Sequence, residues 1–257
     1  HYIAWRKRIG NLDNADKTKN GYYKLLKTIL NYGTKWHDFN FTSIYNKIEK
    51  FNNPNKPPKE MQFYTWEEFK QFISVIDDIK WKALFEVLFF CELRRGELRE
   101  LTWYNIDFYN NRLSVVKNVV QEGDSRQYIL TTPKTRTSTR TLPLPQKVMD
   151  DIHELYLREK KQYGFNEKRY VFGDKEHLSA HILRYTKNKY TQLAGVKQIR
   201  IHDFRHSCES VLINNGASIM VVAKFLGHAK IDETLNTYSH LFKNKMDEIV
   251  QTVNNLE

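Results

Sequence analysis

Three of the six prolines in this chain of 257 residues lie within five positions, at Pro54, Pro57 and Pro58. Proline has no backbone N–H and pushes the residue before it out of the helical region, so no regular helix is expected to cross this segment. We therefore expect residues 52–59 to form an extended linker. The chain is predicted to fold as one domain over 1–59 that includes the linker, a second domain over 60–242, and a C-terminal tail over 243–257.

Positive charge is concentrated before and within the linker. The chain has 41 Lys and Arg against 30 Asp and Glu, a net charge of +11. Residues 1–60 hold twelve Lys and Arg and five Asp and Glu, a net +7, so the other 197 residues carry only +4. Such a balance favours a polyanionic partner, either nucleic acid or an anionic membrane surface, but many basic proteins bind neither.

Composition excludes several classes of protein. The chain is 40% hydrophobic and 14% aromatic without low-complexity runs, which argues against a disordered or collagen-like chain. No stretch approaches 18 consecutive apolar residues, so no membrane span is expected, and no secretory signal is visible. Two cysteines, Cys91 and Cys208, cannot form a framework of several disulfides, and we expect a cytoplasmic protein.

Apolar spacing predicts a mainly α chain with a small antiparallel β-sheet. Before the linker, three- and four-residue spacing predicts helices over 22–30 and 44–51. After the linker, Thr65-Trp66-Glu67-Glu68 has the pattern of a capping box that opens a helix. Further helices are predicted over 81–91, 145–164, 178–194, 204–214, 218–226 and 232–242, and strands over 113–116, 128–131 and 140–142.

The segment Ile201-His202-Asp203-Phe204-Arg205-His206 has the features of an anion site. His202 and Arg205 are three residues apart at a helix start, so both project from one face, where backbone donors and the helix dipole also favour an anion. A capped and solvated helix start explains the same residues, and for this motif taken singly it is the more common explanation.

Three other segments carry weaker signals. In Leu93-Arg94-Arg95-Gly96-Glu97-Leu98, Glu97 lies one turn after Arg94 and is expected to hold its guanidinium in place. An ordinary surface salt bridge explains the same residues, and for this segment taken singly it is the more common explanation. Tyr238 is a nucleophile only beside cations, because a free phenol has a pKa of about 10; most tyrosines are structural. Lys134, between two predicted strands, is a proton donor if its turn reaches a leaving oxygen, and is otherwise solvated.

The order of these segments is more specific than any one of them, and it resembles the catalytic domain of the tyrosine recombinases, a family of site-specific DNA recombinases. The resemblance covers residues 61–242. Its motifs are Cys91-Glu92-Leu93-Arg94-Arg95-Gly96-Glu97-Leu98, Lys134, His202-Asp203-Phe204-Arg205-His206-Ser207, Leu226-Gly227-His228 and Tyr238-Ser239-His240. The sequence departs from the family pattern at Glu92, where glycine is usual, and at Cys208-Glu209-Ser210, where small and apolar residues are commoner.

The resemblance implies a catalytic set and its chemistry. Tyr238 is expected to attack the scissile phosphate and form a 3′-phosphotyrosyl link. Arg94 and Arg205 would bind the non-bridging oxygens, His202 and His228 would add hydrogen bonds, and Lys134 would protonate the 5′ leaving oxygen. Glu97 would orient Arg94 from behind. No metal or other cofactor is expected, because the covalent link conserves the bond energy for rejoining.

The resemblance also implies partners and a cellular setting. Residues 1–59 would be a helical core-binding domain that clamps double-stranded DNA attachment sites together with the catalytic domain. The protein would act as a homo-tetramer on two sites in the bacterial cytoplasm, with accessory DNA-bending factors as further partners. The tail would either pass to a neighbouring protomer or pack on its own domain, and the sequence favours neither. Integration and excision of a mobile element is the expected task. DNA contacts are expected from Arg6, Lys7, Arg8, Lys24, Lys27, Arg136 and Arg140.

The start of the chain and several rival functions bear on this interpretation. Because the chain begins at His1 without a methionine, we expect a longer protein with an arm-type DNA-binding domain ahead of it.

Two rival functions fit parts of the sequence. A type IB topoisomerase shares the chemistry but does not exchange DNA partners, and a non-catalytic basic DNA-binding protein would leave Tyr238 with a structural role only. A metal site at His202 and His206 lacks an evident carboxylate partner, and Cys208 as a nucleophile lacks an evident base.

Overall fold

The computed structural model describes residues 1–52, 62–91, 93–116, 118–121, 128–131 and 140–225, together with Asn254. The chain folds into two compact units, His1–Glu60 and Met61–Glu257, and each has its own hydrophobic core. None of the helices in the described ranges has the length and apolar content that a membrane span requires.

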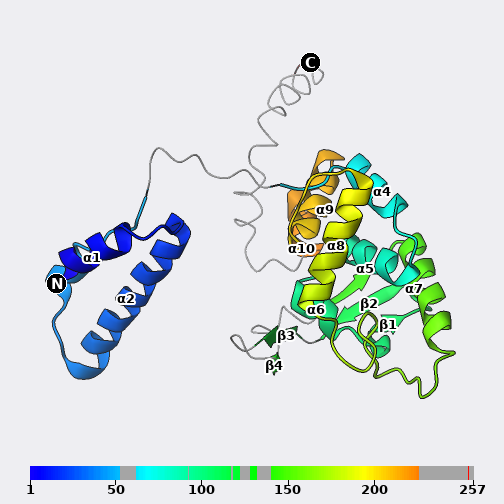
Figure 1. Ribbon diagram of the computed structural model, residues 1–257, viewed down its shortest axis with the longest axis horizontal. Helices are drawn as coiled ribbons and strands as arrows, with labels where there is room; N and C mark the ends of the chain where they lie inside the picture. The colour runs from blue at the N-terminus through cyan, green and yellow to red at the C-terminus, as the bar shows by residue number, and fades with distance from the viewer. Residues whose placement is uncertain are drawn as a thin grey trace. The chain divides into compact units, whose positions relative to one another are not determined.

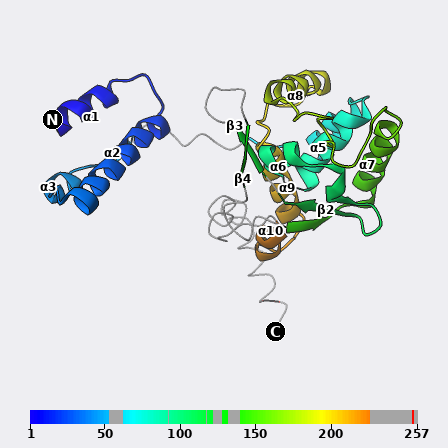
Figure 2. The ribbon, with the colours of Figure 1, turned by 90° about the horizontal axis from the view of Figure 1, so that it is seen from below.

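The first unit is helical in its described residues. It contains α1 (Tyr2–Gly10), α2 (Asp16–His37) and α3 (Thr42–Tyr45), with α2 as the long element (Figure 2). Tyr23, Leu30 and Ile48 form its buried core, and the side chains packed around them are those of Tyr2, Leu26, Phe41 and Phe51. The helix predicted over 22–30 is therefore present and forms the middle of α2.

The helix predicted over 44–51 ends at Tyr45, and this part of the prediction is wrong. The side-chain amide of Asn20 accepts a hydrogen bond from the Phe51 backbone N–H at 2.8 Å and donates one to the Phe51 carbonyl at 2.8 Å. These two bonds replace the helical partners that Phe51 would otherwise use. The apolar spacing in this segment thus reflects burial of a loop against α2 and not a helix face.

The second unit is built mainly of helices. They are α4 (Trp66–Ser74), α5 (Ile79–Phe90), α6 (Arg95–Glu100), α7 (Gln146–Glu159), α8 (Ala180–Ala194), α9 (Asp203–Asn214) and α10 (Ile219–Phe225), with a 3-10 turn η1 (Trp103–Asn105). The helix predicted over 232–242 lies outside the described residues. The predicted capping box at the start of α4 is confirmed, since the Glu68 N–H donates to Thr65 Oγ1 and the Thr65 N–H donates to Glu68 Oε2.

The strands form two small antiparallel sheets in the described residues. β1 (Ile106–Asp107), β2 (Arg112–Val115) and β5 (Arg140–Pro143) form one sheet in the order β1-β2-β5, and β3 (Asn118–Gln121) pairs with β4 (Tyr128–Thr131). The prediction placed the three strands that it found in one sheet, whereas 128–131 belongs to the separate hairpin that lies beside α6 (Figure 2). The prediction contained no strand over 118–121, so 128–131 lacked the hairpin partner that it has in the structure.

Helix α5 is the centre of the second unit. It packs against α7 and α9 (Figure 1). Its residues from Ala83 to Phe89 are buried. At the start of α9 the ring of Phe204 packs against Phe85, with ring centroids 5.5 Å apart, and against Tyr64 at 5.6 Å. These contacts fix the start of α9 on the core.

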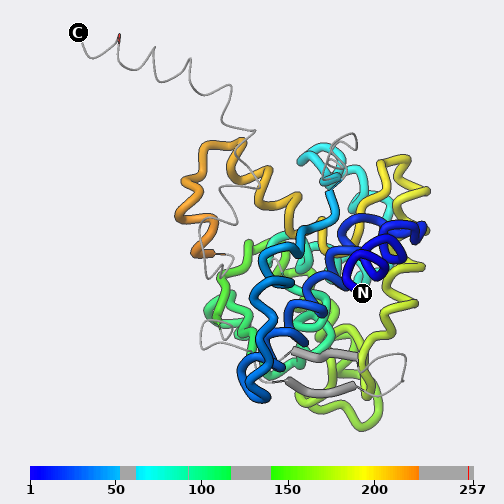
Figure 3. The backbone as a smooth tube through the Cα atoms, turned by 90° about the vertical axis from the view of Figure 1, so that its left-hand side faces the viewer, coloured from blue at the N-terminus to red at the C-terminus, as the bar shows by residue number. Residues whose placement is uncertain are grey.

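A glycine follows two of the helices of the second unit. Gly195 follows α8 with φ 66°, and Gly216 follows α9 with φ 86°, a region that side chains with a Cβ rarely adopt. After Gly216 the chain turns back, so that α10 packs beside α9 (Figure 3). The helix predicted to run to Gly164 ends earlier, at Glu159.

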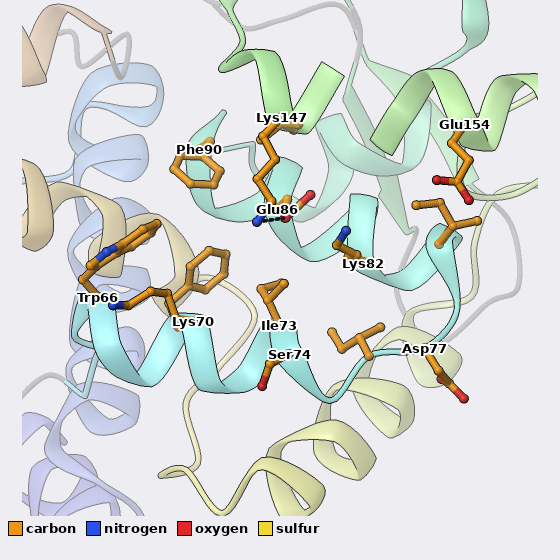
Figure 4. A pocket seen from close by; sticks show the side chains of 14 residues that line it. Trp66, Lys70, Ile73, Ser74, Asp77, Lys82, Glu86, Phe90, Lys147 and Glu154 are labelled. Atoms are coloured by element: carbon orange, nitrogen blue, oxygen red, sulfur yellow. Dashed lines mark ion pairs between the residues drawn. The ribbon is translucent and has the colours of Figure 1, made fainter. Parts of the chain in front are cut away.

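Two carboxylates are buried next to each other between α5 and α7. Glu86 is 2% exposed and Asp151 8%. Lys82 Nζ lies 2.9 Å from Asp151 Oδ2, and Lys147 Nζ lies 4.0 Å from Glu86 Oε1, the ion pair drawn in Figure 4. Glu86 lines a cavity of about 650 Å³. Burial, and then the hydrogen bond and charge of Asp151, raise the pKa of Glu86 to about 8.

This pair predicts that the second unit loses stability as the pH rises. The folded protein keeps a proton on Glu86 up to about pH 8, whereas the unfolded chain releases it near its ordinary pKa of 4.5. The folded state therefore binds more protons between these values, and the free energy of unfolding falls with rising pH, by on the order of 1–3 kcal/mol. Glu86→Gln removes this contribution, so urea unfolding of the full chain at pH 5.5 and pH 8 will show a smaller loss for the variant.

Glu154→Gln is the matched control, because Glu154 lines the same cavity from an exposed position on α7. It is expected to follow the wild-type pH dependence. Equal pH dependence of wild type and Glu86→Gln would contradict the prediction.

Candidate active site

The predicted anion-binding segment lies at the start of α9. His202 is the N-cap residue, and Asp203 and Phe204 are buried in the first turn. Asp203 accepts hydrogen bonds from Arg200, whose backbone N–H lies 2.7 Å from Oδ2 and whose Nη2 lies 2.7 Å from Oδ1. These bonds and the Phe204 packing hold the loop before the helix from two sides, so His202 and Arg205 start from a fixed backbone.

His202 is held as a neutral imidazole. Partial burial lowers its pKa, and the neighbouring His206 and Arg205 lower it further. The His202 and His206 rings meet at an interplanar angle of 86° with centroids 5.0 Å apart. Since an unperturbed histidine has a pKa of about 6.5, His202 is uncharged at neutral pH and is suited to exchange a proton.

Arg205, in the first turn of α9, is buried. It is 3% exposed, and its Nε donates to Glu209 Oε1 at 3.3 Å. Glu209 is 0% exposed, and its other oxygen lies 3.1 Å from His206 Nδ1. The same carboxylate therefore contacts two neighbouring residues of the predicted histidine–arginine segment.

Arg94 has the carboxylate partner that its spacing predicts. The Arg94 backbone N–H donates to Glu97 Oε2 at 2.9 Å, and Nη1 donates to Oε1 at 3.0 Å. Arg140 on β5 adds two bonds to the same carboxylate, at 3.2 Å from Nη1 and 3.0 Å from Nη2. Burial acts to raise the pKa of Glu97, but Arg140 and Arg94 outweigh it and the pKa is lowered, so Glu97 stays charged.

A basic hollow connects the start of α6 with the start of α9. It has a volume of about 500 Å³, and its lining includes Arg95, Arg184, Arg200 and His202. Lys187 on α8 also lines it; its Nζ donates to the Ile199 carbonyl at 2.6 Å, and burial lowers its pKa. The fold thus brings residues that are far apart in the sequence to one cationic surface beside His202.

The structure shows what surrounds the residues predicted to contact DNA. Lys7, Arg8 and Lys24 are exposed. Arg6 donates to the Glu49 carbonyl at 2.6 Å, and the Lys27 ammonium lies over the Tyr45 ring. Arg140 has Glu97 as an internal partner. The DNA contacts of these residues stay predictions.

Lys134, Arg136, His228 and Tyr238 lie outside the described residues. For these four, the assignment of roles rests on the sequence and stays a prediction. Within the described residues, no group of three or more His, Cys, Asp and Glu side chains is placed to hold a metal ion.

Sequence reasoning missed three features of this region. Arg140 was assigned to DNA and not to Glu97, because a contact between a strand and a distant helix leaves no local pattern. Glu209 was noted as a departure from the family but given no role. Arg95, Arg184 and Arg200 were overlooked, since isolated cations do not stand out among 41 Lys and Arg.

Comparison with known proteins identifies the family. A profile described as the phage integrase family matches residues 62–245. The ICEBs1 integrase of Bacillus subtilis is 31% identical over 246 residues, covering 90% of this chain and 66% of its own. A XerC-like tyrosine recombinase of Caldanaerobacter subterraneus is 29% identical, covering 94% and 67%. The chain thus spans about two thirds of the length of these relatives.

Solved structures share the fold. The integrase of the Tn1549 transposon, in complex with a circular intermediate DNA, superposes with a TM-score of 0.73 at 21% identity, covering 97% of this chain and 83% of that one. A XerA recombinase superposes with a TM-score of 0.58 at 18% identity, covering 90% and 82%.

The predicted fold class and the resemblance to tyrosine recombinases are both confirmed by these matches, because the profile covers most of the second unit and the structures share its architecture. On this ground the chain belongs to the phage integrase family.

Proposed function

We propose that the protein is a site-specific DNA recombinase that cleaves and rejoins strands through a 3′-phosphotyrosyl intermediate, and that its task is integration and excision of a mobile element. The observation that carries the proposal is the pairing of each predicted catalytic arginine with a buried carboxylate, Arg94 with Glu97 and Arg205 with Glu209. The neutral His202, which lines the cationic hollow, lies in the same segment as Arg205. The names of the relatives support the same reading, since they include an integrase of a transposon and tyrosine recombinases.

The proposed reaction assigns the described residues to the phosphate. Arg94 and Arg205 bind the non-bridging oxygens, where negative charge grows in the transition state, and fixed cations at such a position contribute several kcal/mol. His202, being neutral, donates a hydrogen bond or takes a proton there. Glu97 stays charged and therefore keeps the Arg94 guanidinium oriented before the DNA arrives.

The remaining steps belong to residues outside the described ranges. Tyr238 attacks phosphorus and becomes linked to the 3′ phosphate, while Lys134 gives a proton to the 5′ oxygen that leaves. His228 adds a hydrogen bond to the same phosphate. Reversal with a new 5′ hydroxyl rejoins the strands, and this residue set needs no metal or nucleotide because the phosphotyrosyl link conserves the bond energy.

The same proposal assigns the units and partners. The basic first unit acts as the core-binding domain, and together with the second unit it holds double-stranded attachment sites. A tetramer assembles on two sites in the bacterial cytoplasm, and accessory DNA-bending factors shape the sites. The tail over 243–257 has an apolar helical spacing at Met246, Ile249, Val253 and Leu256 and passes to a neighbouring protomer.

Tyr238→Phe tests the nucleophile. With a nicked suicide duplex that carries the junction sequence of the element, the wild type is expected to form a covalent protein–DNA band on a denaturing gel, and the variant none, because only the phenol oxygen forms the link. An equal band from the variant would overturn the assignment. Relaxation of plasmids that lack the junction sequence would favour a type IB topoisomerase instead.

Arg140→Gln tests whether Arg140 positions Glu97 or only holds DNA. Charge-assisted hydrogen bonds contribute about 1.5–3 kcal/mol, so losing them is expected to slow single-turnover cleavage at saturating DNA roughly 10- to 100-fold. Arg112→Gln removes an exposed cation from the neighbouring strand β2 and serves as the control, with an unchanged cleavage rate. A weaker DNA affinity with full cleavage at saturation would show Arg140 to be a DNA contact only.

Deletion of residues 244–257 tests the tail. Cleavage of a single-site suicide duplex is expected to continue, because the predicted catalytic residues all precede the deletion, while complexes that pair two sites disappear from native gels. Normal pairing after the deletion would mean that the tail packs on its own protomer.

A further inference from the structure

Glu209 is a fully buried carboxylate in the helix that carries the predicted histidine–arginine segment. Its exposure is 0%, and the neighbouring Ser207, Cys208 and Ser210 are buried as well. A buried carboxylate is costly unless charged or hydrogen-bonding groups surround it. Here the contacts include Arg205 Nε at 3.3 Å and His206 Nδ1 at 3.1 Å.

Helical geometry explains why one carboxylate reaches both groups. Arg205 lies four residues and His206 three residues before Glu209, and both separations place side chains next to each other on a helix. His206 in turn meets the His202 ring edge to face. A continuous row of contacts therefore runs from Glu209 to Arg205 on one side, and through His206 to His202 on the other.

The helix itself offers Glu209 a rigid base. Ser207 Oγ donates to the Asp203 carbonyl at 2.7 Å and accepts from the Tyr64 backbone N–H at 2.8 Å, which ties α9 to the segment before α4. Phe204 packs on the core on the same side. Against this fixed backbone, the long arginine side chain is the part that still needs a partner to hold its orientation.

We propose that Glu209 is a positioning residue for strand cleavage: its buried carboxylate fixes the Arg205 guanidinium and the His206 ring, and through His206 the ring of His202, in the orientation that meets the scissile phosphate. The inference rests on the proposed function. Glu209 would then do for Arg205 what Glu97 does for Arg94: each is a buried carboxylate that binds the guanidinium, although the two carboxylates lie in different helices.

Glu209→Gln separates positioning from DNA binding, because glutamine keeps the size and removes the charge. Single-turnover cleavage of the suicide duplex at saturating DNA is expected to fall on the order of 10- to 100-fold, with DNA affinity in gel shifts within about twofold of wild type. Glu209→Asp restores the charge at a shorter reach and is expected to recover part of the rate.

Glu86→Gln is the matched control. It makes the same Glu-to-Gln replacement at another fully buried position of the second unit, in a cavity whose lining includes neither His202 nor Arg205, and it is expected to cleave at the wild-type rate. Thermal melting of each variant identifies any change in folding. If Glu209→Gln melts below the assay temperature, Glu209→Asp carries the test, with slower cleavage at an unchanged melting temperature expected.

Two results overturn the inference: wild-type cleavage by the folded Glu209 variants, or a loss of cleavage that disappears when DNA is saturating. A covalent band from Tyr238→Phe in the same gel would instead overturn the proposed function. The two failures are therefore distinguishable in one experiment.

Discussion

Phe204 packs between Phe85 and Tyr64 at the start of α9, and the placement of the charged residues around it depends on that packing. Burial of a phenylalanine side chain contributes roughly 2–3 kcal/mol and fixes the rotation of the helix about its axis. That rotation sets the directions in which the side chains of His202 and Arg205, on either side of Phe204 in the sequence, leave the backbone. An apolar contact with no part in the chemistry thus determines where the polar groups point.

The fold then meets a second constraint, the cost of burying charge. Arg205 and Glu209 are both buried, and Glu97 is buried beneath Arg94 and Arg140. Such groups are tolerated only when several charge-assisted bonds are made at once. The arrangement that satisfies this requirement also restricts the guanidinium groups before any substrate arrives, so stability and preorganisation have the same structural origin.

The sequence predicted the parts of this structure that local patterns encode. The capping box at Thr65, the Arg94–Glu97 contact and the helix start at His202 all depend on residues within one turn of each other. The motif order was specific enough to identify the family.

What could not be predicted depends on contacts between distant segments. The loop that Asn20 holds at Phe51 and the Arg140–Glu97 bonds link residues 31 and 43 positions apart. Glu209 shows a different limit. Its spacing to Arg205 is local and can be seen in the sequence, but the burial that distinguishes this contact from a surface ion pair cannot. An exposed carboxylate at that position would be an ordinary surface ion pair.

The net charge of +4 in residues 61–257 combines two kinds of cation that have different tasks. Arg205, Arg140 and Lys187 are largely buried and are bound to groups of the protein itself, so they add little to long-range attraction. Arg95 and Arg184 are exposed and line the hollow that also includes His202. In the proposed reaction the exposed set attracts the phosphate backbone in a salt-dependent way, whereas the fixed set stabilises the transition state. Because separate residues carry the two tasks, DNA affinity can change through the exposed set without disturbing the geometry that cleaves.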